Sequence, residues 1–182
     1  TQLGLLPGLR ELRFSQGEIS GVLPTEIGGL GNLRLLEVDA NKLSGTVPPW
    51  LTALSRLSTL NLNSNSLSGT LPLFTRTAPP LVSLSIEQNR LSGVIPSQLG
   101  HIQSLKWFRG SKNVLSGSLP TELAALTISD LSLDWARVNG GRRPSWVSAY
   151  HGSDLVSWRY STQASPYVVN TTGMSGALAE GS

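Results

Sequence analysis

Few side chains in this sequence are placed for catalysis or for metal binding. The two histidines, His101 and His151, stand about fifty residues apart, and the chain of 182 residues contains no cysteine. A nucleophilic triad or a zinc site needs such groups close together, so the sequence favours neither. Glu37 and Asp39 share one segment, but neighbouring acids on a polar strand face usually remain solvated charges. We therefore expect no catalytic residue, no metal site and no cofactor.

The composition is that of a folded domain rather than of a nucleic-acid-binding or membrane-spanning protein. Hydrophobic residues make up 39% of the chain and charged residues 14%, which argues against disorder. The formal net charge is only +3, and basic residues are interspersed with acidic ones, so nucleic acid is not an expected partner. No window approaches the roughly 18 to 20 consecutive apolar residues of a membrane span.

The residue types that do recur at fixed spacing define a repeat of 24 residues. Five consecutive blocks begin at Leu9, Leu33, Leu57, Leu81 and Leu105. Inward-facing strand residues are expected three and five places after each start, at Leu12 and Phe14, Leu36 and Val38, Leu60 and Leu62, Leu84 and Ile86, and Phe108 and Gly110. Such short alternation is typical of a β-strand. The fixed period predicts a solenoid of stacked coils.

An amide side chain follows most of these strands at the same place. The eighth place after each block start holds Gly17, Asn41, Asn65, Asn89 and Asn113. At this corner the chain leaves the strand with its backbone polar groups pointing inward, and an asparagine amide can satisfy both buried N–H and buried C=O groups. We expect the four asparagines to form a stacked structural ladder.

Each block then contains two turn signals. Glycine allows a bend that other residues resist, and Ser-Gly pairs occur at Ser20-Gly21, Ser44-Gly45, Ser68-Gly69, Ser92-Gly93 and Ser116-Gly117. A proline follows in every block, at Pro24, Pro48, Pro72, Pro96 and Pro120. Each proline leads into a segment with two apolar positions, such as Ile27 and Leu30, and this predicts a helical turn that closes every coil.

The combined pattern, L-x-x-L-x-L-x-x-N-x-L-S-G-x-[LVI]-P-x-x-L-x-x-L, resembles the plant-type leucine-rich repeat of receptor-kinase ectodomains and polygalacturonase-inhibiting proteins. The match covers residues 9–126 closely. The resemblance implies an α/β solenoid, a leucine-rich repeat arc with a parallel β-sheet on the concave face and short helical or 3-10 turns on the convex face. It also implies a binding module that is not an enzyme.

The repeat register divides the chain into four expected parts. Residues 1–8 fit the end of a preceding repeat, and residues 9–126 hold the five regular repeats. Residues 128–163 fit two irregular repeats, with a seventh strand starting at Leu155, and residues 164–182 fit an irregular tail or a partial cap. A solenoid needs a cap over its terminal core, and neither terminus offers a clear one, so we expect a longer parent protein.

The residues between the inward leucines should form the concave sheet face, where a solenoid of this type carries its specificity. The candidate ligand-binding residues on this face are Trp107, Arg109, Lys112, Asp134, Trp135, Glu87 and Asp39. Two tryptophans beside charged groups have the composition of an interface hot spot or of a sugar-stacking platform. Aromatic residues in irregular repeats also fill gaps and shield an end, and this alternative stays open.

Two further features bear on surface function. A regular lateral strip could be formed by the row after the Ser-Gly pairs, which consists of Val22, Thr46, Thr70, Val94 and Ser118. The same residue types are ordinary in any strand, so ice binding through this strip is only a remote option. Asn170-Thr171-Thr172 satisfies the acceptor pattern for N-glycosylation, which would mark a secreted protein if it were used.

Three functions fit these observations. The first is an extracellular or cell-surface module that binds a protein, a peptide or a glycan through the concave face. The second is a structural or scaffolding subunit, held by its edges and ends among other subunits of an assembly. The third follows from the resemblance to polygalacturonase-inhibiting proteins and is an inhibitor of cell-wall hydrolases.

Overall fold

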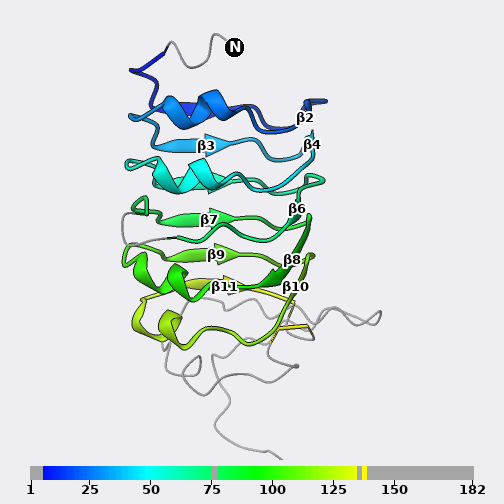
Figure 1. The fold of residues 1–182 in the computed structure, drawn as a ribbon, viewed down its shortest axis with the longest axis vertical. Helices are drawn as coiled ribbons and strands as arrows, with labels where there is room; N and C mark the ends of the chain where they lie inside the picture. Colours follow the sequence, from blue (N-terminus) through cyan, green and yellow to red (C-terminus); the bar gives the residue numbers. More distant parts are fainter. Residues whose placement is uncertain (1–5, 75–77, 135–136, 139–182) are drawn as a thin grey trace, which may run out of the picture.

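The chain winds into stacked coils that share one parallel sheet. The computed structural model describes residues 6–74, 78–134 and 137–138. Each coil contributes one short strand to a six-stranded sheet (Figure 1). In order across the sheet, these strands are β1 (Glu11–Arg13), β3 (Leu35–Glu37), β5 (Thr59–Asn61), β7 (Ser83–Ser85), β9 (Trp107–Arg109) and β11 (Asp130–Ser132). The expected α/β solenoid is confirmed.

The register of the sheet follows the sequence repeat. Leu12 pairs with Leu36 and Leu36 with Leu60, so equivalent side chains of successive coils stack on one another. Phe108 pairs with Leu131, one residue short of the regular period. The inward leucines form one hydrophobic core that runs through all the coils. Each coil therefore buries the apolar side of its neighbour, which is the main stabilising contribution in a solenoid.

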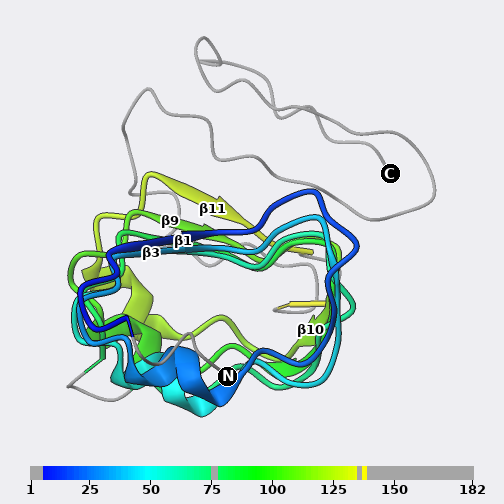
Figure 2. The same cartoon turned by 90° about the horizontal axis from the view of Figure 1, so that it is seen from above.

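Short strands of the Ser-Gly segments line a second side of the coil, the side that carries β10 in Figure 2. They are β2 (Ser20–Gly21), β4 (Lys42–Leu43), β6 (Ser68–Gly69), β8 (Arg90–Val94) and β10 (Val114–Ser116). Gly93 illustrates why glycine recurs here. Its φ is 77°, and a Cβ at this position would lie 2.9 Å from Thr70 Cγ2 of the preceding coil. A larger residue would be strained and would separate the two coils.

A third side of the coil carries 3-10 turns. They are η2 (Thr25–Gly29), η3 (Pro49–Ala53), η4 (Ser97–His101) and η5 (Thr121–Ala125). No helix in the described part of the chain is long and apolar enough to cross a membrane.

The third coil differs from the expectation of a helical turn in every coil. Its described residues Leu73 and Phe74 are not helical, although the equivalent residues begin a 3-10 turn elsewhere. The sequence has Thr75 where the other coils have Ile or Leu, so Phe74 fills the core one place earlier and is 1% exposed. Pro79 and Pro80 follow, and the residue before a proline is disfavoured in helical conformation.

The first coil also departs from the repeat. The pattern places Phe14 and Ile19 in the core, whereas the structure leaves them 45% and 43% exposed. Among the described residues no complete coil precedes this one, so one flank of both side chains is uncovered. Gly17 stands at the asparagine position of this coil, and a Cβ there would lie 2.9 Å from Asn41 Oδ1.

The asparagine ladder joins successive coils through buried hydrogen bonds. Asn65 Nδ2 donates to the carbonyl oxygens of Val38, Leu62 and Asn63 at 3.0, 3.2 and 3.1 Å. Its Oδ1 accepts a bond from the N–H of Leu43 at 3.0 Å. Equivalent sets of bonds are made by Asn41, Asn89 and Asn113. One side chain thus satisfies four inward-pointing backbone groups in each of these coils.

The described ladder ends at Asp134. In the regular coils the N–H of the ladder asparagine donates to a backbone carbonyl of the next coil, as from Asn89 to Lys112 at 3.2 Å. The N–H of Asn113 instead donates to the carboxylate Oδ2 of Asp134 at 3.1 Å. The carboxylate therefore replaces the backbone acceptor at the point where the regular repeat stops.

Replacing Asn65 by alanine tests the ladder. The change removes the partner of three carbonyl oxygens and of one N–H, so the free energy of unfolding should fall by about 2 to 4 kcal/mol. Ser66→Ala in the same coil serves as the control and should change it by less than about 0.5 kcal/mol. Urea denaturation measures both values, and equal effects of the two substitutions would contradict a stabilising ladder.

The end of the ladder can be tested with two substitutions of Asp134. Asp134→Ala leaves the buried N–H of Asn113 without an acceptor and should lower the free energy of unfolding by about 1 to 3 kcal/mol. Asp134→Asn retains an acceptor oxygen and should lose less. Thermal unfolding of the two variants compares them, and the proposed role is wrong if asparagine is as destabilising as alanine.

Candidate functional site

The candidate site is the outer face of the six-stranded sheet, which forms one whole side of the coil (Figure 2). Residues on each strand alternate between the core and this face. On β3, for example, Leu36 is buried, whereas Leu35 and Glu37 on either side of it are partly exposed. Stacking the coils places equivalent outward residues in rows across the sheet, so the chemistry of the face follows from those rows.

The first two coils carry a small charge network on this face. Arg13 Nη1 lies 2.6 Å from Glu11 Oε2, and Arg13 Nε donates to Glu37 Oε2 at 3.0 Å. Arg13 and Glu37 stand directly opposite each other in the register of β1 and β3. Both carboxylates are therefore engaged by a single guanidinium group, and they offer little free charge to a ligand.

Asp39 is engaged in the same way by polar neighbours. Its Oδ1 accepts bonds from Ser15 Oγ at 2.6 Å and from Asn61 Nδ2 at 3.1 Å. These partners come from the coils on either side, so the carboxylate links three coils. Asp39 was a candidate ligand-binding residue on sequence grounds, and the structure places it partly buried within this network.

Glu87 forms the centre of a second polar network. Its Oε1 accepts bonds from the hydroxyl groups of Ser111 and Ser132, and its backbone N–H donates to Asn63 Oδ1 at 2.7 Å. Ser111 and Ser132 are 0% and 3% exposed. In this part of the face the short serine side chains are covered by the longer side chain of Glu87 and bond to its carboxylate. Their hydroxyl groups are therefore not available to a ligand.

The fifth coil presents a more open cluster. Trp107 is 39% exposed and lies in register between Ser83 of β7 and Asp130 of β11. Arg109 Nε donates to Asp130 Oδ2 at 2.6 Å, yet 48% of the arginine side chain remains exposed. Lys112 follows in the next turn and is exposed. An indole can stack on a planar group, and the guanidinium of Arg109, two residues away on the same strand face, can hydrogen-bond to an anionic one.

The seven residues expected to bind a ligand do not all meet in one place. Trp107, Arg109 and Lys112 share the fifth coil, and Glu87 lies on the adjacent one. Asp39 lies three coils from Trp107, which at strand spacing is about 14 Å. The sheet therefore brings four of the residues together and keeps Asp39 apart.

Asp134 requires a correction. It is 6% exposed and its carboxylate accepts the N–H of Asn113, so it supports the ladder instead of lining an accessible surface. Trp135 and the sequon at Asn170 lie outside the described residues, as do His151 and the expected seventh strand. His101 is described and is exposed at the end of η4.

Sequence reasoning missed Asp130 as the partner of Arg109. The register pairs Arg109 with Ser132, and Asp130 lies diagonally across, two residues earlier on β11. A diagonal cross-strand pair is within reach of a long side chain, and this rule could have found the contact. Within the described part of the chain, no group of three or more His, Cys, Asp or Glu residues could hold a metal ion.

Part of the chain is similar to a known protein family. The Leucine Rich Repeat family model matches residues 56–76 and 80–102. No curated protein sequence matches the chain significantly.

Three solved structures illustrate the similarity. The ectodomain of the Arabidopsis thaliana receptor kinase HAESA, solved with a peptide hormone ligand, is 36% identical and aligns with 71% of this chain and 22% of its own, with a TM-score of 0.69. The ectodomain of the Arabidopsis thaliana receptor kinase GASSHO1/SCHENGEN3, in complex with CASPARIAN STRIP INTEGRITY FACTOR 2, is 34% identical over 72% of this chain and 16% of its own, with a TM-score of 0.68. A plant ice-binding protein is 35% identical over 73% of this chain and 43% of its own, with a TM-score of 0.67.

This chain spans less than half the length of each of these three solved chains. The repeat pattern, the coil geometry and these similarities together identify the chain as a leucine-rich repeat protein of the plant type.

Proposed function

We propose that this chain is a non-catalytic recognition module that binds a protein or peptide through the fifth-coil cluster of Trp107, Arg109 and Lys112. The observation that carries the proposal is the exposure of Trp107 on the sheet face. The charged side chains of that face, by contrast, are largely hydrogen-bonded to polar neighbours. A large, rigid aromatic side chain that is surrounded by hydrogen-bonded polar groups is a typical hot-spot residue, one that contributes much of the binding free energy of an interface.

The neighbours of Trp107 favour a partner with a planar or anionic group. Asp130 holds Arg109 in one orientation, so less side-chain entropy is lost when the guanidinium binds a ligand. Lys112 adds a second positive charge on the adjacent turn. A peptide segment that places an aromatic or aliphatic side chain against the indole and a carboxylate near the two cations fits this arrangement.

The similar solved structures support the same class of function. They include the HAESA ectodomain with a peptide hormone ligand, the GASSHO1/SCHENGEN3 ectodomain with CASPARIAN STRIP INTEGRITY FACTOR 2, and the complex of the Arabidopsis thaliana proteins BIR3 and SERK2. By analogy with those ectodomains, we place this chain outside the cell or at the cell surface, within a longer protein.

The proposal is tested by selecting peptides from a random library on the immobilised chain. Trp107→Ala combined with Arg109→Ala should weaken binding of the selected peptides by roughly a hundredfold, the loss expected for a hot-spot residue. Arg13→Ala, in the equivalent row of the first coil, is the matched control and should leave binding unchanged. Retained binding by the double variant, or equal loss in the control, would exclude the fifth-coil cluster.

Ice binding is a second candidate function, favoured by the lateral strip. Val22, Thr46, Thr70 and Val94 project from successive coils, and each packs a methyl group against the glycine of the next coil. The row contains no charged residue, and it is rigid because its backbone is hydrogen-bonded from coil to coil. A solved plant ice-binding protein shares the repeat and is 35% identical.

This second candidate predicts that the chain slows ice growth. Thr46→Lys with Thr70→Lys would place two charges in the strip and should abolish thermal hysteresis, since a charged side chain holds its own hydration shell. Thr121→Lys on η5 adds a charge on another side of the coil and should retain the effect. An unaltered chain without thermal hysteresis at millimolar concentration would rule the candidate out.

A further inference from the structure

Three arginines gather on the edge where the chain enters the sheet. Arg10 directly precedes β1, Arg34 directly precedes β3, and Arg56 lies three residues before β5. All three side chains are exposed. We call Arg10, Arg34 and Arg56 the basic rim. It lies across three consecutive coils, and the sequence hides it because the arginines are more than twenty residues apart.

Backbone hydrogen bonds fix the spacing of the rim. The N–H of Arg34 donates to the carbonyl oxygen of Arg10 at 2.7 Å. The N–H and hydroxyl of Ser58 both donate to the carbonyl oxygen of Arg34, at 2.8 and 3.0 Å. Adjacent backbones in such a ladder are about 4.8 Å apart. The ladder therefore holds Arg10 and Arg34 one strand spacing apart, and Arg56 lies two residues before Ser58, the third-coil residue of the same ladder.

Asn32 orients the third arginine along the rim. Arg56 Nη1 donates to Asn32 Oδ1 at 2.6 Å, and Asn32 Nδ2 donates to the carbonyl oxygen of Pro7 at 2.7 Å. Asn32 occupies the same place in the second coil as Arg56 in the third. The Arg56 guanidinium therefore reaches back over the second coil, toward the part of the edge that carries Arg10 and Arg34.

Among the described residues, no acid is paired with the rim arginines. The position just before each block start, the start itself and the position after it hold no Asp or Glu in any of the six coils. In the described part of the chain, neither Arg10 nor Arg34 forms an ion pair, whereas Arg13, Lys42 and Arg109 do. The charge of the rim is thus available to a partner.

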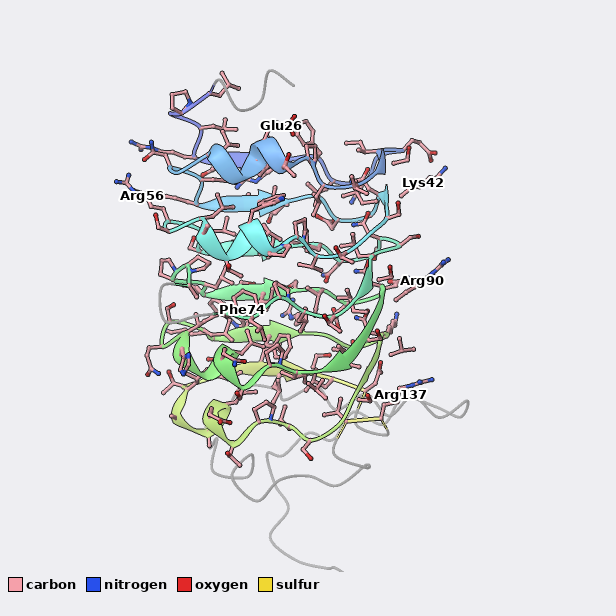
Figure 3. All side chains as sticks on the ribbon, viewed as in Figure 1. Glu26, Lys42, Arg56, Phe74, Arg90 and Arg137 are labelled. Carbon is pink, nitrogen blue, oxygen red and sulfur yellow. The ribbon has the colours of Figure 1, made fainter. Side chains whose placement is uncertain are left out.

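The opposite edge also carries exposed cations, but one of them is paired with an acid. Figure 3 shows Lys42, Arg90 and Arg137 on the edge across from Arg56. Lys42 is paired with Glu18, and Lys42 and Arg90 are two coils apart, about 10 Å at strand spacing. At physiological ionic strength the Debye length is about 8 Å, so charges at that separation act nearly independently. Charges on adjacent coils act together.

From this arrangement we infer that the basic rim binds a linear anionic polysaccharide, with carboxylate or sulfate groups along the chain. A guanidinium group binds either anion through paired hydrogen bonds. The rim positions themselves carry no aromatic side chain, whereas protein interfaces rely on such anchors. A polymer that offers repeated charge and little apolar area suits the surface better than a folded protein does. This site is separate from the fifth-coil cluster and does not depend on the function proposed for it.

The test measures retention of the 182-residue chain on polygalacturonate, dextran sulfate and neutral dextran. The unaltered chain should bind both anionic polymers and not dextran, and binding should weaken steeply with added salt. The variant with Arg10→Gln, Arg34→Gln and Arg56→Gln should bind roughly tenfold or more weakly. The variant with Lys42→Gln, Arg90→Gln and Arg137→Gln removes the same charge from the opposite edge and should keep most of the affinity.

Three outcomes would overturn the inference. The first is that the unaltered chain does not bind either anionic polysaccharide at low salt. The second is an equal loss of binding in the two triple variants, which would show that only the net charge of the chain matters and not the position of the arginines. The third is binding to polyglutamate without binding to the polysaccharides, which would assign the rim to an acidic peptide. Circular dichroism confirms that both triple variants are folded, and preference between the two anionic polymers identifies the acidic group.

Discussion

The structure depends on the need to satisfy backbone polar groups where each coil turns into its own core. Amide and carbonyl groups at this corner are away from water, and leaving four of them without partners would cost about 4 to 12 kcal/mol, which is comparable with the net stability of a whole domain. Asn65 and its equivalents meet the need with a single side chain. Because every ladder asparagine also bonds to the preceding coil, the same groups hold the stack in register.

This internal solution leaves the outer surfaces free to differ from coil to coil. The outward row that holds Arg13, Glu37, Asn61, Ser85 and Arg109 contains a different group in nearly every coil. The inward residue just before each of them is leucine in four coils and Phe108 in the fifth. On the sheet face most charged groups are engaged by neighbours from adjacent coils, and Trp107 remains accessible. On the rim the arginines are left without acids. The sheet face and the basic rim thus differ in chemistry although the same core and ladder support both.

The features that the sequence predicts are those in which a residue performs the same physical task in every coil. The inward leucines, the ladder and the Ser-Gly corners belong to this group, because a Cβ at Gly93 or a missing amide at Asn65 would disturb any coil in the same way. The exceptions arise where the context of one coil differs. Phe14 has no complete coil on one side, and Phe74 compensates for a polar residue at the usual core position.

Side-chain pairing on the surface was harder to foresee, because it depends on which residues the register brings together. Arg109 meets Asp130 through a diagonal contact between strands, and the carboxylate of Asp134 accepts a bond from the N–H of Asn113. The rim arginines are far apart in sequence and become neighbours only after the coils stack. Along the sequence these arginines therefore look interspersed with acidic residues.

Leu73 and Phe74 of the third coil show which part of a coil can vary. Leu73 and Phe74 do not begin a 3-10 turn, yet β5 and β7 on either side stay in register and Asn65 keeps all of its bonds. The sheet and the ladder thus tolerate a change of conformation on the outer side of the coil. In an evolving repeat array, this is the segment where insertions and new loops can accumulate without disturbing the neighbouring repeats.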